Sequence, residues 1–147
     1  MRTDTINNLA FASLAIAMVI EKSEKLELTK ALLIMPFLAH KELLSYLANG
    51  KTKVRGLDKL IVDKLHCFSN FNKRYYDNLS TSLNALQFLS EVDVVSIENS
   101  NIVSREKVEC VNSMGGRLKR ALKASDNIAK ILNEDASSLY LNLRVEL

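Results

Sequence analysis

The chain has 147 residues, enough for one domain that buries roughly 70% of its unfolded surface in a single core. Apolar residues make up 48% and charged residues 25%, a composition that excludes a disordered chain, and one proline with four glycines favours long helices. We therefore predict a mainly α fold, a single helical domain over residues 1–147. Cys67 and Cys110 lack metal-ligand spacing and the density of a disulfide-stapled domain, so we expect free, mostly buried thiols in a reducing, cytoplasmic compartment.

The segment Leu9–Ile20 is apolar apart from Ser13. It is too short to span a bilayer, which needs about 20 residues. We predict instead a core helix, capped near Asn7 or Asn8, and no membrane contact.

A charged break at residues 21–27 separates this helix from a second apolar helix, predicted over Leu28–Met35. Pro36 lacks a backbone donor and crowds the preceding turn, so a kink or restart is expected there, with Phe37–Leu47 as a separate amphipathic helix. Asn49-Gly50 favours a helix end.

A basic loop follows at residues 51–56, and a helical stripe over Leu57–Phe68 predicts a helix that runs on towards Tyr75 and Tyr76.

The stretch from Ser80 to Ser104 has the outline of a helix that runs into a hairpin. Leucines recur at helical spacing up to Leu89, and residues 92–97 are then rich in β-branched residues, which favour strands. Residues 98–101 supply turn chemistry, and Ile102-Val103 returns as a second strand. This outline predicts a winged-helix-like domain, a class that binds nucleic acid or other proteins; the alternative is a helix and hairpin that serve only as scaffold.

The C-terminal third contains two further predicted helices. Residues 104–114 are expected to hold a short helix or strand that Gly115-Gly116 ends. Arg117–Leu132 has a strong apolar face, and Asp135–Leu141 reads as a capped short helix before an extended tail.

The sequence offers no catalytic constellation. His40 and His66 have no carboxylate or thiol at a spacing that recurs in metal sites, so a structural role is expected for each. His66 and Cys67 are adjacent, but successive helical side chains point about 100° apart, which argues against a base and nucleophile pair. We therefore predict no catalytic residue, no metal and no cofactor.

Charge is unevenly distributed. Residues 51–74 carry a net +5 and residues 105–130 a net +4, whereas residues 75–104 contain four acids and no base. One interpretation is that the flanks touch a nucleic-acid backbone weakly and without sequence preference; the other is that both are ordinary solvated faces. The candidate backbone contacts are Lys51, Lys53, Arg55, Arg117, Lys119, Arg120 and Lys123.

A partner interface is expected at exposed aromatic residues, because tyrosine and phenylalanine contribute much contact energy for little lost entropy. The candidates are Tyr75, Tyr76, Phe88 and Tyr140.

Four places in the sequence resemble the middle component of three-component ABC systems. They are Asn7-Asn8-Leu9-Ala10 opening an apolar helix, the LL-x-LP-LVLH-type segment from Leu32 to Glu42, Gly56-Leu57 opening a helix that leads into the hairpin, and the closing segment Ser137–Val145. The glycine usual in that tail is replaced by Asn142 or Leu143, and lysines and tyrosines replace an arginine-rich middle, which leaves the subfamily open.

The resemblance implies a non-enzymatic adaptor between an SMC-like or RecF-like ABC ATPase and an effector, in an antiphage defence complex of the Lamassu type. The alternative is a stand-alone winged-helix transcriptional regulator that reads bases with Asn84 or Gln87. The acidic charge of the predicted helix and wing counts against that alternative.

Overall fold

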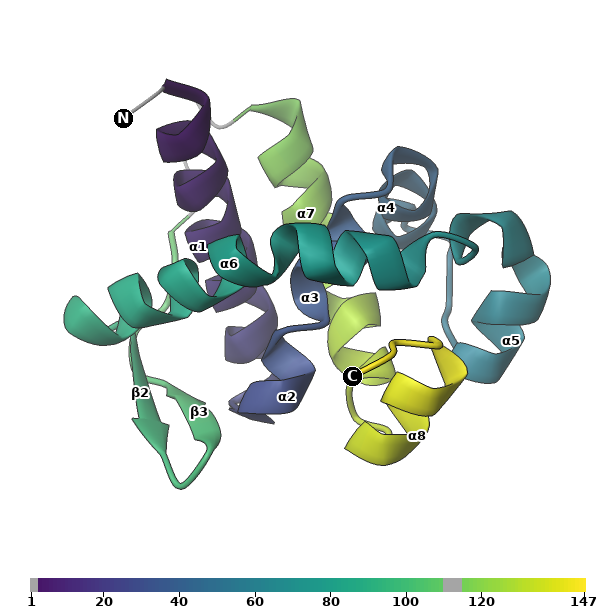
Figure 1. The fold of residues 1–147 in the computed structure, drawn as a ribbon. Coiled ribbons are helices and arrows are strands. Elements are labelled where there is room, and N and C mark those ends of the chain that lie inside the picture. The colour runs from purple at the N-terminus through teal and green to yellow at the C-terminus, as the bar shows by residue number, and fades with distance from the viewer. Residues whose placement is uncertain (1–2, 110–114) are drawn as a thin grey trace.

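The computed structural model describes residues 3–109 and 115–147, with side chains from residue 8 onward. The fold is mainly α, with a small three-stranded antiparallel sheet (Figure 1). In chain order the elements are α1 (Thr3–Ser23), β1 (Lys25–Glu27), α2 (Leu28–Ala31), α3 (Ile34–Leu38), α4 (Lys41–Ala48), α5 (Leu57–Asp63), the 3-10 turn η1 (Leu65–Cys67), α6 (Phe71–Glu91), β2 (Val95–Glu98), β3 (Asn101–Ser104), α7 (Gly116–Ile131) and α8 (Ala136–Asn142).

Helix α1 lies in the core, packed against α6 and α7. Every residue from Ala15 to Ile20 is buried, and Ile16 and Ile20 are completely so. A helix that is apolar all round has to be enclosed by other elements, which explains why the sequence shows no polar face here. The predicted core helix is confirmed, although it begins at Thr3, before the expected cap at Asn7 or Asn8, and continues to Ser23.

The predicted break at Pro36 is wrong in its position. Helix α2 ends at Ala31 and α3 begins at Ile34, across a turn at Leu32-Leu33, and Pro36 lies in the first turn of α3, where its missing N–H would have had no helical partner. A second break follows at Ala39-His40, and α4 begins after it. There the His40 Nδ1 accepts a hydrogen bond from the Leu43 N–H at 3.2 Å, so the expected structural role of His40 is confirmed.

The helix predicted to run from Leu57 towards Tyr76 is interrupted. It ends at Asp63, passes through η1, and α6 starts afresh at Phe71. The interruption turns Phe68 inward beside Phe71 and Phe37, with ring centroids 5.1 to 6.2 Å apart. This aromatic cluster fixes α3 against the start of α6.

The predicted hairpin is confirmed as β2 and β3, joined by Asn99 and Ser100. Both turn residues have positive φ, 51° and 64°, as a two-residue turn that matches strand twist requires. Strand β1 was missed, because the sequence predicts only a charged break there. It pairs with β3 through Leu26 opposite Ile102, giving the order β1-β3-β2. A helix followed by a hairpin is what the winged-helix prediction requires, and that assignment stays a prediction.

The C-terminal helices are confirmed as α7 and α8, and the Asp135 carboxylate caps α8 by accepting from the Ser138 N–H at 3.1 Å. Residues 105–109 form neither the helix nor the strand expected from 104 onward. The remaining residues of that prediction, 110–114, and Cys110 with them, lie outside the described residues. Cys67 is buried with a free thiol.

No single helix among the described residues is long and apolar enough to cross a membrane. Only a pair of segments, Leu28–Leu38 and Lys41–Ala48, reaches the required length and composition together, and it is bent by 104°.

Candidate functional site

The four aromatic residues predicted to contact a partner do not share one environment. Phe88 and Tyr76 are 47% and 45% exposed, as a contact surface requires. The expectation that Tyr75 is exposed is wrong, because its side chain is only 4% exposed, and Tyr140 is half-buried. A contact role for Tyr76 and Phe88 stays a prediction.

The tyrosines instead hold the C-terminal segment in place. Tyr140 donates to the Thr29 carbonyl at 2.6 Å, and its hydroxyl lies 3.3 Å from that of Tyr75. The Tyr76 hydroxyl donates to the Glu146 carbonyl. Burial, followed by the hydrogen bond to Tyr75, raises the pKa of Tyr140, so its hydroxyl remains a donor at neutral pH. These contacts attach α8 and the tail to α2 and α6.

Apart from Leu147, the most exposed large apolar side chains of the described residues lie on a groove between α5, η1 and α8, which we call the α5–α8 groove. Val62 is 74% exposed and Leu65 67%, and Leu141 faces them from α8 at 77%. The groove has a volume of about 950 Å³ and extends to Asn72 at the start of α6. The groove could not be predicted from the sequence, because its walls come from segments about 80 residues apart. One signal was present: Leu139, Tyr140 and Leu141 are consecutive apolar residues, and one buried face of a helix cannot cover all three.

A second apolar surface lies at the other end of α6. It comprises Phe88 and Val92, one helical turn apart and each 47% exposed, together with Ile97 on β2. We call it the α6–β2 surface. Figure 1 shows the hairpin under the C-terminal end of α6 and α5 and α8 at its N-terminal end. From Asn72 to Phe88 the helix rises about 24 Å, so the two surfaces are well separated.

The basic loop residues Lys51, Lys53 and Arg55 are all exposed. The loop is fixed to α7 by Asn127, whose buried amide donates to the Leu47 carbonyl at 2.8 Å and more weakly to the Thr52 carbonyl at 3.4 Å. The hydrogen bonds of Asn127 therefore fix the backbone that carries these exposed charges.

The second basic group occupies the first two turns of α7. Lys119 and Lys123 are exposed, and the guanidinium of Arg117 stacks on the Phe11 ring at 3.9 Å. About seven residues of helix separate Arg120 from the loop contact at Asn127, so the two basic groups are offset by about 10 Å along α7.

Arg74 was counted with the first basic segment, but its guanidinium is half-buried and bonded to two backbone carbonyls. Its Nε donates to the Pro36 carbonyl at 3.0 Å and its Nη2 to the Cys67 carbonyl at 2.9 Å. Two of its three guanidinium nitrogens are therefore engaged within the fold.

The acids of α6 and the hairpin are exposed at Glu91, Asp93 and Glu98. Arg105 partly compensates them by pairing with Glu98 at 3.0 Å and donating to the Ser96 hydroxyl. Gln87, a candidate base reader, donates its amide to Glu91 at 3.3 Å. This face repels a phosphate backbone.

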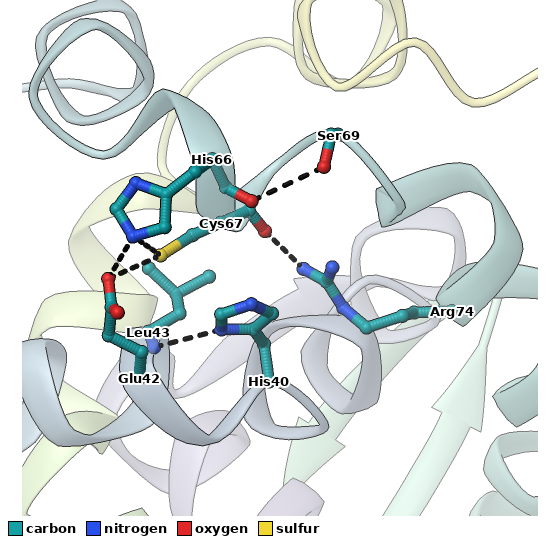
Figure 2. Close-up of polar contacts among 7 residues, drawn as sticks. All are labelled: His40, Glu42, Leu43, His66, Cys67, Ser69 and Arg74. Carbon is teal, nitrogen blue, oxygen red and sulfur yellow. Dashed lines mark hydrogen bonds and ion pairs between the residues drawn. The ribbon is translucent and has the colours of Figure 1, made fainter.

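A cluster that the sequence analysis missed brings Glu42, His66 and Cys67 together (Figure 2). The Cys67 Sγ lies 3.3 Å from the Glu42 Oε2 and 3.7 Å from the His66 Nε2, and that same nitrogen contacts Glu42. The expectation that the adjacent side chains of His66 and Cys67 point apart is wrong, because both reach towards the Glu42 carboxylate on α4. We refer to these three residues as the Glu–His–Cys cluster.

The cluster does not have the form of a nucleophile–base–acid triad. A triad histidine uses one nitrogen for the nucleophile and the other for the acid, whereas here Nε2 faces both. Burial, and then the hydrogen bond to Glu42, raises the pKa of Cys67 to about 11, which keeps the thiol protonated at neutral pH. The hydrogen bonds from His66 and then Cys67 lower the pKa of Glu42.

The fold therefore defines a mainly α protein with a small antiparallel sheet, two separated apolar surfaces and the Glu–His–Cys cluster. A family profile described as ABC-three component (ABC-3C) system Middle Component 3 matches residues 4–147, and the chain belongs to this family. The predicted resemblance to the middle components is confirmed, and the subfamily left open is component 3. Comparisons with curated proteins and with solved structures find no match.

Proposed function

We propose that this middle component is a non-enzymatic adaptor, which links an SMC-like or RecF-like ABC ATPase to an effector in an antiphage defence complex. The observation that carries the proposal is the pair of exposed apolar surfaces, the α5–α8 groove and the α6–β2 surface, at opposite ends of α6. A protein that binds one partner needs one such surface, whereas a bridging subunit needs two. Exposed apolar patches of this kind mark interaction sites.

The absence of an enzymatic role is supported by the chemistry of Cys67. Its thiol lies beside a histidine and a carboxylate, yet its environment favours the thiol over the nucleophilic thiolate. We therefore assign the catalytic activities of the complex to its other subunits.

The adaptor proposal predicts that each surface serves a different partner. Val62→Asp with Leu65→Asp, in the groove, should lower the affinity for one of the two partners about 30-fold or more and leave the other unchanged, because a charge is placed where an apolar contact forms. Phe88→Asp with Val92→Asp should do the reverse. Binding of the purified ATPase and the purified effector to each variant, measured separately by calorimetry, checks this.

All four substituted residues are at least 47% exposed, so the helical circular dichroism signal should remain native. A matched control places the same two charges at exposed polar positions away from both surfaces, Ser45→Asp with Ser80→Asp, and should bind both partners normally. The bridging proposal fails if both surface variants retain both partners.

We also propose that contact with DNA is electrostatic and comes from the two basic groups, in preference to sequence reading by a regulator. Lys51, Lys53 and Arg55 are exposed on a held loop, whereas the α6–hairpin face carries acids and has Gln87 engaged with Glu91. Affinity should therefore fall steeply with salt, with a logarithmic slope near 0.9 per phosphate contacted on duplex DNA.

Exchange of Lys51, Lys53 and Arg55 for glutamine should flatten the dependence of DNA affinity on salt. The same exchange at the second basic group should do so too, at Arg117, Lys119, Arg120 and Lys123. The control is Lys73→Gln, since the Lys73 ammonium is paired with Asp77; it should leave the slope unchanged. The variants Asn84→Ala and Gln87→Ala should also leave it unchanged. Fluorescence anisotropy with duplexes of unrelated sequence measures it. A preference for one operator, lost in the Asn84 or Gln87 variant, would instead favour the regulator.

A further inference from the structure

We propose that Glu42, His66 and Cys67 form a binding site for a divalent transition-metal ion of the zinc class, which ties η1 to α4. The three candidate donor atoms, Oε2, Nε2 and Sγ, all lie within 4.8 Å of one another. Glu42 comes from the first turn of α4, whereas His66 and Cys67 come from η1, so the ion would join two segments about 24 residues apart in sequence. The site is independent of the adaptor role proposed above.

The donor set fits zinc and its neighbours. A thiolate, an imidazole and a carboxylate are the three protein ligand types that bind Zn²⁺, whereas Mg²⁺ and Ca²⁺ prefer sites of oxygen alone. In a tetrahedral site with a Zn–S bond of about 2.3 Å and Zn–N and Zn–O bonds of about 2.1 Å, the sulfur lies about 3.6 Å from each of the other two ligands. The observed distances from Cys67 Sγ, 3.3 Å to Glu42 Oε2 and 3.7 Å to His66 Nε2, lie on either side of that value.

The remaining adjustment falls on an exposed ligand, Glu42. The His66 Nε2 and Glu42 Oε2 are in direct contact, so an ion has to separate them. Both side chains are more than half exposed, at 64% and 51%, and the Glu42 carboxylate can move back by rotation without disturbing the core. Coordination by Cys67 forms a metal–sulfur bond and releases the thiol proton to solvent.

Neighbouring residues already hold the ligand backbones in place (Figure 2). His40 caps the start of α4 just before Glu42 through its contact with the Leu43 N–H. Arg74 donates to the carbonyl of Cys67 at 2.9 Å, and the Ser69 hydroxyl donates to the carbonyl of His66 at 3.3 Å. These contacts fix the backbone from which the ligand side chains extend.

Three protein ligands leave a fourth tetrahedral position. Cys67 closes the buried side, whereas Glu42 and His66 are exposed, so this position faces solvent and takes a water molecule. Burial and the Glu42 carboxylate raise the pKa of Cys67 more than the nearby Lys64 and Arg74 lower it, so metal binding has to displace the thiol proton.

The test uses the full chain carrying Cys110→Ser, so that Cys67 is the sole thiol. After removal of metal with a chelator, titration with ZnCl₂ should show one ion bound per chain and a rise in the melting temperature. Co²⁺ should replace Zn²⁺ and produce the absorption of a cobalt–thiolate bond. We expect His66→Ala and Cys67→Ser to lower zinc affinity about 100-fold or more, and Glu42→Gln to lower it about 10-fold or more.

The matched control is His40→Asn, which removes the other histidine but keeps a side chain able to cap α4; its zinc affinity should change less than about threefold. Circular dichroism of the Glu42 and His66 variants, both altered at exposed positions, separates loss of a ligand from loss of the fold. The site is overturned if the parent chain shows no stoichiometric zinc and no cobalt–thiolate absorption. It is equally overturned if binding persists unchanged in Cys67→Ser and His66→Ala, which would identify adventitious surface binding.

Discussion

Phe37→Ala is expected to lower the free energy of unfolding by about 3–5 kcal/mol, the cost of removing a buried aromatic ring and leaving a cavity. Phe37 is completely buried, and its ring meets that of Phe71 at 5.1 Å and that of Phe68 at 6.2 Å, both edge to face. It is one of the contacts that fix α3 to the start of α6. Urea unfolding followed by circular dichroism measures the effect, with the slope in denaturant unchanged.

The control is Phe88→Ala, which removes the same ring from a position that is 47% exposed. We expect it to cost less than about 1 kcal/mol, because little apolar area leaves the core. Similar costs for the two variants would mean that the cluster of Phe37, Phe68 and Phe71 is not part of the core.

The elements that could be predicted from sequence are those whose signal is local. α7 shows its apolar face over four turns, α8 carries its own cap at Asp135, and the hairpin carries Asn99-Ser100 at a turn that needs positive φ. In each case the residues that determine the structure are neighbours in the chain. Propensity and periodicity therefore suffice.

The elements that were missed depend on distant partners. β1 has only three residues, too few to show alternation, and it is a strand because Leu26 pairs opposite Ile102, 76 positions later. The stripe from Leu57 to Tyr76 is helical in period, yet it breaks so that Phe68 can turn in towards Phe37. Tertiary packing overrides local propensity in both places.

The same distinction holds for the candidate sites. The exposed charges of the 51–56 loop were predictable, because a loop between two helices lies at the surface. The burial of Tyr75 was not predictable, because the exposure of a helical residue depends on which face of the helix the rest of the chain covers. Glu42 lies 24 residues before His66, and only the turn at η1 reveals that the two side chains meet. Spacing rules for metal sites do not include such a pair.

Arg74 gives the sharpest case in which charge counting and structure disagree. Counted as one base among seven, it belongs to a surface that attracts phosphates. In the fold it joins three elements instead, since from α6 it donates to a carbonyl of α3 and to one of η1. Its guanidinium also lies over the Phe71 ring at 5.2 Å.

We expect Arg74→Met to lower the free energy of unfolding by about 2–4 kcal/mol, because the apolar stem is kept while the carbonyls of Pro36 and Cys67 lose a charged donor. Lys73→Met, at the preceding position, should change it by no more than about 0.5 kcal/mol, since that ammonium makes an exposed pair with Asp77. Both substitutions remove one positive charge, so a purely electrostatic role predicts equal effects on stability. Equal unfolding free energies for the two variants in urea would therefore exclude the packing role that the structure assigns to Arg74.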